Sequence, residues 1–204
     1  MTLYKLTAAD GRTKNNTQWG ENVTHTATGD IAQALCSNAW IHAYESPEIA
    51  VLMNPLHAAF DPFQLWQAEG NPEIYDGQIK CGCRSLTTIR RVPIPAFDSQ
   101  QVKRFAVHCA AQVCDDGGWR AWAHSWLSGK RNQSFSMVKS YRIHSARSAA
   151  WCAMKAVDEI RPQFEAANAA SFAHYCVGAD IFAAIEFAKG TSTELPKVVA
   201  GMQG

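Results

Sequence analysis

The chain has 204 residues, of which 47% are hydrophobic and 18% are charged, a composition that favours a folded protein of one or two domains over a disordered one. Its formal net charge of +1 gives no overall basic excess, so nucleic acid is not an expected partner. The amino end has no apolar segment of signal-peptide length and no run of about 18 apolar residues occurs, so we expect a cytoplasmic protein without a membrane partner.

The first part of the chain, up to about residue 97, combines short apolar runs with turn-forming residues, a pattern typical of β-strands and loops. The predicted strands are Leu3–Leu6, Trp40–Tyr44, Gln64–Ala68 and Leu86–Val92. A helix is predicted from Pro47 to Met53, because Ser46 is a good N-cap and proline suits the first helical position. Asn54-Pro55 is expected to end this helix.

From about residue 98 the sequence becomes rich in alanine and follows the helical period. An amphipathic helix is predicted from Ser99 to about Val113, and a second, tryptophan-rich helix follows the break at Asp115–Gly118. Two longer helices are predicted at about Ser136–Ile160 and Pro162–Lys189, with small side chains that allow close packing. The tail, residues 191–204, is expected to be only partly ordered.

These patterns predict the α+β class. We expect a small α+β domain with a mixed β-sheet over residues 1–97, packed as one rigid unit on an alanine-rich helical bundle over residues 98–190.

Seven cysteines are present, and several occupy apolar helical positions where a free thiol packs like a small hydrophobic side chain. Cys36, His42, Cys81 and Cys83 lack the paired spacing of a structural zinc site, so no metal site is predicted. Cys36 with His42 or His57 is a candidate pair for nucleophilic catalysis by a thiol.

Polar side chains suited to ligand binding lie on the first three predicted strands: Lys5, Thr7, His42, Tyr44, Gln67 and Glu69. The order of two strands, a helix and a third strand resembles the ADP-ribosyltransferase-like fold. The resemblance implies that Lys5 and Thr7 hold the nicotinamide-ribose end of NAD, in places where the superfamily has arginine or histidine and a hydroxyl side chain.

The same resemblance implies a catalytic role for Glu69, whose carboxylate would stabilise the positive charge that develops on the ribose at the transition state. Tyr44 and His42 would complete the catalytic group, and Gln67 would contribute to ligand binding beside them. NAD is the cofactor that this alternative requires.

A second pattern covers most of residues 4–94 and consists of Tyr4-Lys5-Leu6-Thr7, Asp10-Gly11, Cys36, His42-Ala43, Pro47, Leu65 to Glu69 and Lys80-Cys81-Gly82. It resembles a family of uncharacterised bacteriophage proteins, with Ala39 where that family tends to have glycine. The resemblance implies a phage accessory protein in the host cytosol that counters host defence. It would inhibit a host factor or sequester a nucleotide-type ligand, and it would require no cofactor.

Trp119, Trp122 and Trp126 are three and four residues apart and share one helix face. Such a stripe packs in a core or, where it is exposed, forms a protein interface. It is the predicted surface for a protein partner, and a homo-oligomer remains open. The sequence thus favours a phage-encoded binding protein, with an NAD-dependent ADP-ribosyltransferase and a structural phage protein as alternatives.

Overall fold

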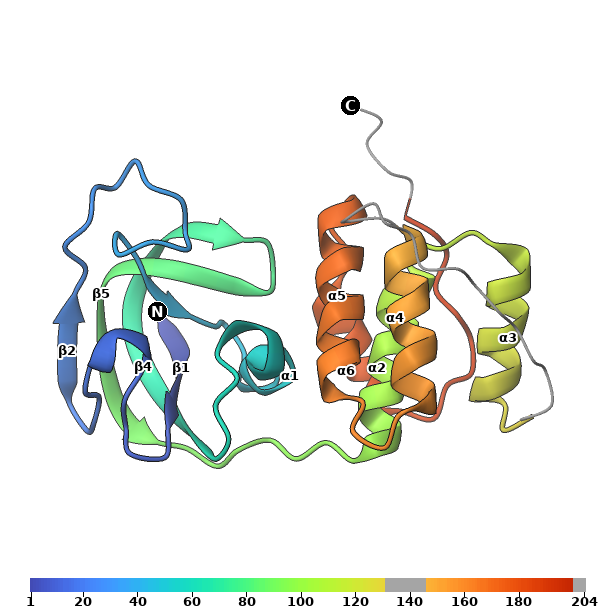
Figure 1. Cartoon of the computed structure of the whole chain (residues 1–204), viewed down its shortest axis with the longest axis horizontal. Helices are drawn as coiled ribbons and strands as arrows, with labels where there is room; N and C mark the ends of the chain where they lie inside the picture. Colours follow the sequence, from blue (N-terminus) through green and yellow to red (C-terminus); the bar gives the residue numbers. More distant parts are fainter. Residues whose placement is uncertain (131–145, 200–204) are drawn as a thin grey trace. The chain divides into compact units, whose positions relative to one another are not determined.

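The computed structural model describes residues 1–130 and 146–199, and the chain divides into two compact units, Met1–Ala96 and Phe97–Gly204 (Figure 1). The first unit is built on a five-stranded sheet, whereas the described residues of the second form helices and no strand. The α+β class predicted from the sequence is therefore confirmed.

The strands of the first unit are β1 (Thr2–Ala8), β2 (Val23–Thr26), β3 (Ile41–Ala43), β4 (Phe63–Asp76) and β5 (Lys80–Arg91). Their order is β1-β4-β5-β2, and β3 also pairs with β5. All of these described pairings are antiparallel, so the prediction of a mixed sheet is wrong. Only three residues join β4 to β5, which is too short for the crossover that a parallel pair needs.

The sheet is curved, so that β1 comes next to the chain that follows β3. Tyr4 in β1 and Tyr44, just after β3, exchange two backbone hydrogen bonds of 2.8 and 2.9 Å. Because β3 already pairs with β5, these bonds close a hydrogen-bonded ring of β1, β4, β5 and β3. One core cluster of the first unit consists of Leu3, Trp19, Ala43, Ala68, Cys81, Cys83 and Leu86, most of which stand on these strands.

Both long strands extend further than the sequence indicated. β4 continues through Gly70 and Pro72 with register shifts around them, and β5 begins at Lys80 instead of Leu86. A Cβ atom at residue 70 would lie 2.9 Å from Leu86 Cδ1, so glycine permits this close approach. Glycine and proline in a strand mark such irregularities as well as turns. Strand β2 was not predicted at all.

Helix α1 (Pro47–His57) begins as predicted, because the Ser46 hydroxyl accepts hydrogen bonds from the backbone N–H groups of residues 48 and 49. The prediction that Asn54-Pro55 ends this helix is wrong. Pro55 lies in the last turn, where its missing N–H costs a single hydrogen bond. The Asn54 side chain also bonds both backbone groups of Phe60 and so fixes the chain beyond the helix. His57 is thereby placed at the helix end.

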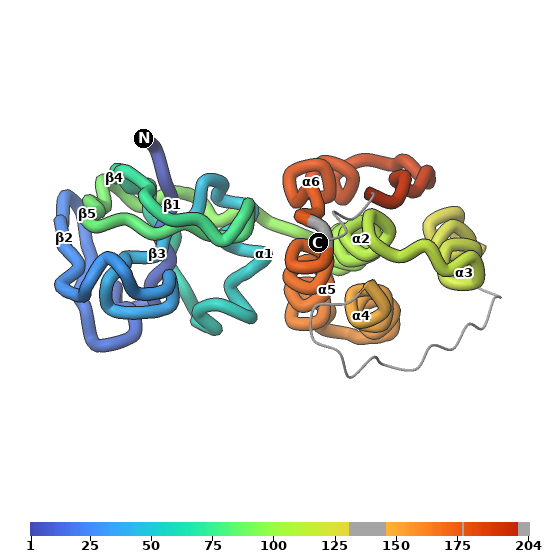
Figure 2. The backbone as a smooth tube through the Cα atoms, turned by 90° about the horizontal axis from the view of Figure 1, so that it is seen from above, coloured from blue at the N-terminus to red at the C-terminus, as the bar shows by residue number. Residues whose placement is uncertain are grey.

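The helices of the second unit are α2 (Ser99–Ala111), α3 (Gly117–Leu127), α4 (Ala146–Asp158), α5 (Gln163–Val177) and α6 (Ile181–Lys189). Helix α2, which starts with a capping box of Asp98 and Gln101, packs against α4, α5 and α6 (Figure 2). The prediction of one helix over Pro162–Lys189 is wrong, because Gly178 adopts a left-handed conformation and ends α5.

Two further predictions fall partly outside the described residues. The first ten residues of the helix predicted from Ser136 lie outside them, as do residues 200–204 of the tail. The described part of the tail, up to residue 199, is held at its end by a 2.8 Å hydrogen bond from the Val199 N–H to the Gln112 carbonyl. Within the described residues, every helix is too short or too polar to cross a bilayer.

Candidate functional site: a lysine- and histidine-lined cavity

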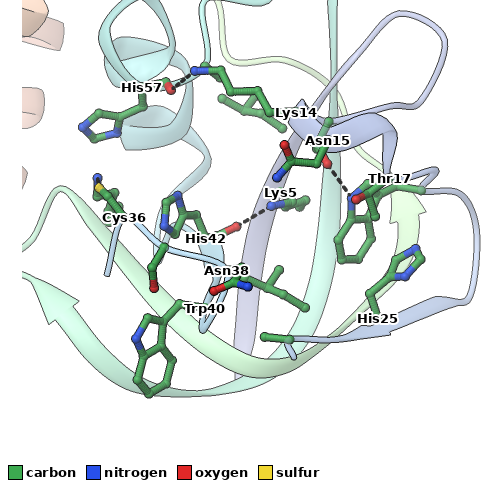
Figure 3. A pocket seen from close by; sticks show the side chains of 18 of the residues that line it. Lys5, Lys14, Asn15, Thr17, His25, Cys36, Asn38, Trp40, His42 and His57 are labelled. Carbon is green, nitrogen blue, oxygen red and sulfur yellow. Dashed lines mark hydrogen bonds between the residues drawn. The ribbon is translucent and has the colours of Figure 1, made fainter. Parts of the chain in front are cut away.

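The first unit contains a cavity of about 810 Å³ beside β1 and β3 (Figure 3). Its walls come from β1, β3, the end of β2 with the two residues after it, the last turn of α1 with residues 58 and 60, the first residue of β5, and the segments at residues 13–19 and 36–40. Small-molecule sites typically occupy about 300–1,000 Å³, so the cavity has the size of a ligand site.

Charge is distributed unevenly between this cavity and the rest of the first unit. Residues 1–96, all of which the structure describes, contain three lysines and three histidines, and all six line the cavity: Lys5, Lys14, Lys80, His25, His42 and His57. The same residues contain nine aspartates and glutamates, none of which lines it. The unit has only seven lysines and arginines against these nine carboxylates, so the basic lining does not simply reflect a basic overall composition. The cavity is therefore suited to anions.

Lys5 and Lys80 are the two buried lysines of the cavity wall, and Lys5 is the one on β1. Its Nζ donates a 2.7 Å hydrogen bond to the His42 carbonyl and lies 5.2 Å from the centre of the Trp19 ring. Burial lowers the pKa of Lys5 from its ordinary value to about 8, because the charged form loses solvation. Lys5 remains mostly protonated at pH 7, and no carboxylate in the described residues forms an ion pair with it.

Lys14 and Lys80 bring two further ammonium groups to the cavity. Lys14, in the short 3₁₀ helix Lys14–Asn16, is exposed and donates to the His57 carbonyl at 3.3 Å. Lys80 donates to Cys36 Sγ at 3.1 Å, and its Nζ lies 3.8 Å from Asp76 Oδ2. Asp76 thus offsets part of the Lys80 charge, while Lys14 is held by a neutral acceptor and keeps its charge available to a ligand.

Two of the histidines differ in how their rings are fixed. His42 Nε2 lies 2.6 Å from the Leu35 carbonyl oxygen, which can only accept, so Nε2 carries a proton. His57 Nδ1 lies 3.3 Å from the Tyr44 hydroxyl, and the two rings stack with 6.0 Å between their centres. Burial lowers the pKa of His57 to about 4, so its imidazole is neutral at pH 7. Burial raises the pKa of Tyr44, whose hydroxyl therefore keeps its proton.

Of the six side chains predicted to form a site, the structure brings Lys5, His42 and Tyr44 together on the cavity wall. Thr7 is fully buried, where its hydroxyl accepts from Trp66 Nε1 at 3.1 Å and donates to the Ala8 carbonyl at 3.0 Å.

Gln67 and Glu69 do not line the cavity. They flank the buried Ala68 in β4, and successive side chains of a strand point to opposite faces, so both lie on the face away from the core. Glu69 is exposed. The expected cleft of Lys5, His42, Tyr44 and Glu69 does not form, because the carboxylate is on the other face of the sheet.

Sequence reasoning did not assign Lys14, Lys80 or His25 to the site. It considered Cys36 and His57 only for thiol catalysis and, for Cys36, a metal site. One signal was available in the sequence. The first 96 residues contain only three lysines, so each of them could have been examined as a candidate site residue. Cys36 lines the same cavity as His42 and His57, on one side of Lys5, while His25 lies on the other side (Figure 3). The hydrogen bond to the Cys36 sulfur comes from Lys80.

The three tryptophans of α3 divide into two groups. Trp119 is fully buried and donates from Nε1 to the Ala150 carbonyl at 3.2 Å, so it belongs to the core and is not available to a partner. Trp122 and Trp126 are half-buried, and for them a partner surface stays a prediction. In the described part of the chain, no group of three or more histidine, cysteine, aspartate or glutamate side chains could hold a metal ion.

No protein family model matches this chain, and it has no significant match among curated proteins or solved structures.

Proposed function

We propose that this protein binds and sequesters a small anionic ligand of the nucleotide type in the cavity of its first unit. The observation that carries the proposal is the segregation of charge, since every lysine and histidine of residues 1–96 lines the cavity and none of the nine carboxylates does. Ammonium groups form strong charge-assisted hydrogen bonds with phosphate oxygens.

The size and the neutral lining of the cavity favour a ligand larger than inorganic phosphate. A volume of about 810 Å³ leaves space for groups beyond a single phosphate. The amides of Asn15 and Asn38 and the hydroxyl of Thr17 offer hydrogen bonds to a sugar or a base. Phe60 and the imidazole of His57, both half-buried, offer flat surfaces on which a base can stack.

Binding without turnover is favoured over NAD-dependent ADP-ribosyl transfer. The transferase needs a carboxylate next to the ribose, and Glu69 lies on the opposite face of the sheet from the core, outside the cavity. A protein that removes a nucleotide signal from solution also accords with the predicted role of a phage accessory protein that counters host defence. That role rests on the resemblance seen in the sequence.

Calorimetric titration of the full chain with NAD, ADP-ribose, cyclic nucleotides and inorganic phosphate tests the proposal. We expect saturable binding of at least one nucleotide. Lys14→Met and Lys80→Met should each weaken it about tenfold or more, because a hydrogen bond to a charged group contributes about 1.5–3 kcal/mol. Arg90→Met is the control, since it also removes one positive charge of the first unit, but from an exposed position outside the cavity.

Two outcomes would contradict sequestration in the cavity. One is the absence of saturable binding for every nucleotide tested, and the other is an equal loss of affinity in Arg90→Met, which would indicate non-specific attraction. Release of nicotinamide from NAD that is lost in Glu69→Gln would instead support the transferase.

A further inference from the structure

The hydrogen bond between His42 and the Leu35 carbonyl determines what the other ring nitrogen can do. Nε2 donates to this carbonyl over 2.6 Å, so the neutral imidazole has its lone pair on Nδ1. A lone pair repels an anionic oxygen, whereas a protonated Nδ1 donates a charge-assisted hydrogen bond to it. His42 therefore presents a different group to an anion in each of its two charge states.

The other two histidines of the cavity differ from His42, His57 in its hydrogen bond and His25 in its position. His57 Nδ1 lies 3.3 Å from the protonated Tyr44 hydroxyl, which can donate to it and leave Nε2–H as a donor in the neutral ring. His57 can then bind an anion without taking up a proton. His25 Nε2 is fixed by the Gln18 carbonyl at 2.7 Å, but His25 lies across the cavity from His42 (Figure 3).

The charged and titratable groups around His42 come from four elements. Lys5 in β1, Lys80 at the start of β5 and Lys14 in the 3₁₀ helix bring positive charge, and the neutral imidazole of His57 faces it from α1. Burial lowers the pKa of His42, the three lysines lower it further, and the hydrogen bond to Leu35 opposes the effect. Asp76 contacts Lys80 and is the nearest compensating carboxylate among these groups. In the free protein His42 is therefore neutral at pH 7.

An anionic ligand reverses the sign of this electrostatic environment. Its negative charges offset those of the three lysines, so a proton on His42 no longer adds to an uncompensated positive cluster. We propose that His42 binds the phosphate or pyrophosphate group of the ligand in its protonated form, so that ligand binding in this cavity takes up a proton. This inference rests on the proposed function and assigns to His42 the recognition of a fully ionised phosphate group.

The expected pH dependence follows from linkage. Protonation is favoured in the complex and disfavoured in the free protein, so affinity rises as pH falls through the range between the two pKa values of His42. One coupled proton changes the affinity by at most about tenfold per pH unit. A ligand whose own charge is constant in this range is needed, because a phosphate monoester titrates near pH 6.

The first test is calorimetry with ADP-ribose, whose pyrophosphate does not titrate between about pH 5.5 and 8, and with sulfate as a second non-titrating probe. Titrations of the full chain at one pH in two buffers of different ionisation enthalpy give the number of protons taken up. We expect uptake of about 0.5–1 proton per ligand near pH 6.5. His42→Gln should abolish this uptake, and its amide can still donate to the Leu35 carbonyl. Arg90→Met should leave the uptake unchanged.

The second test follows His42 directly by NMR, through the pH titration of its Cε1–H resonance, which is assigned by its loss in His42→Gln. The inference expects the pKa of His42 to be higher in the presence of saturating ADP-ribose or sulfate than in the free protein.

Saturable binding without proton uptake, or with an unchanged His42 pKa, would overturn proton coupling and leave the proposed function standing. If neither ADP-ribose nor sulfate binds between pH 5.5 and 8, the inference is overturned, and the wider nucleotide titrations decide the proposed function separately.

Discussion

At the scale of single residues, Cys36 is distinguished from the other cysteines by its exposure. Five of the seven are buried, Cys176 is half-buried, and only Cys36 is exposed. It also lies at the cavity, where the Lys80 ammonium donates to its sulfur. Cys36 is thus a chemical reporter on the site.

We predict that iodoacetamide, an uncharged reagent, modifies Cys36 before any other cysteine of the native protein. A bound ligand should slow this reaction about tenfold at a free concentration ten times its Kd, because the reagent then reaches only the unoccupied fraction. Mass spectrometry of peptides after timed labelling measures both effects. Cys36→Ser should remove the fast reaction, whereas preferential labelling of a different cysteine would contradict the predicted exposure.

A site residue could be predicted from the sequence where its position depends on a local strand, but not where it depends on how the strands pair. Lys5, His42 and Tyr44 lie at the cavity, and all three stand on predicted strands. Glu69 does not, because it alternates with the buried Ala68 in β4 and so occupies the other face of the sheet. Which face of this strand meets the core depends on its pairing with β1 and β5, which are distant in the sequence. Lys80 reaches the cavity only because β5 starts six residues before the predicted strand.

At the scale of secondary-structure elements, Gly82 lets β5 pass beneath the loop that carries Cys36. A Cβ atom at this position would collide with Leu35 Cδ1, lie 2.7 Å from Ile74 Cγ2 and lie 3.0 Å from Trp40 Cβ. The first two are ends of flexible side chains, but the third is fixed to the backbone. Leu35 is also the acceptor for His42, so a shift here reaches the site.

We predict that Gly82→Ala lowers the free energy of unfolding by about 1–3 kcal/mol, the usual cost of adding a methyl group to a well-packed core. Denaturant titration followed by tryptophan fluorescence measures the change. Gly20→Ala is the matched control in the same unit, because its Cβ would meet only Val23 Cγ2 at an ordinary 3.5 Å. Equal stability of the two variants would show that the Leu35 loop moves without cost.

The errors at this scale have one physical cause. Asn54-Pro55 is expected to end the first helix, and the strand predicted from Gln64 stops at Ala68, before Gly70 and Pro72. In the structure Pro55 lies inside α1, and Gly70 and Pro72 lie inside β4. A proline or glycine inside a helix or strand costs at most a few kcal/mol, and favourable tertiary packing can outweigh this cost. The caps, in contrast, depend on residues within one turn of each other, and the predicted Ser46 cap and the helix start at Ser99 are confirmed. The opposite error occurs at Gly178. The helical pattern of apolar residues continues across this glycine and predicts one helix, but the glycine ends α5.

At the scale of the whole molecule, the chain consists of two units with separate cores. In the first unit most members of one core cluster stand on the strands, and in the second α2 forms the core with the helices packed on it. Every residue that lines the cavity lies within residues 5–80, so the second unit contributes no wall to it. Pro93 and Pro95 stand in the irregular segment before the unit boundary at residue 96.

We predict that a fragment of residues 1–96 folds alone and binds the ligand with a Kd within about threefold of that of the full chain, because a domain with its own core folds independently. Circular dichroism establishes folding, and calorimetry gives the affinity. A fragment of residues 97–204 should not bind. A folded first fragment without affinity would place part of the binding energy in the second unit.

The segregation of charge in the first unit has a consequence for large polyanions. Outside the cavity, this unit carries nine carboxylates against four arginines. A nucleic-acid strand is too large to enter a volume of about 810 Å³, and it meets this negative exterior, whereas a free nucleotide can reach the lysines inside. For the proposed nucleotide ligand we therefore expect discrimination by size among anions, so that RNA and DNA do not compete for the cavity.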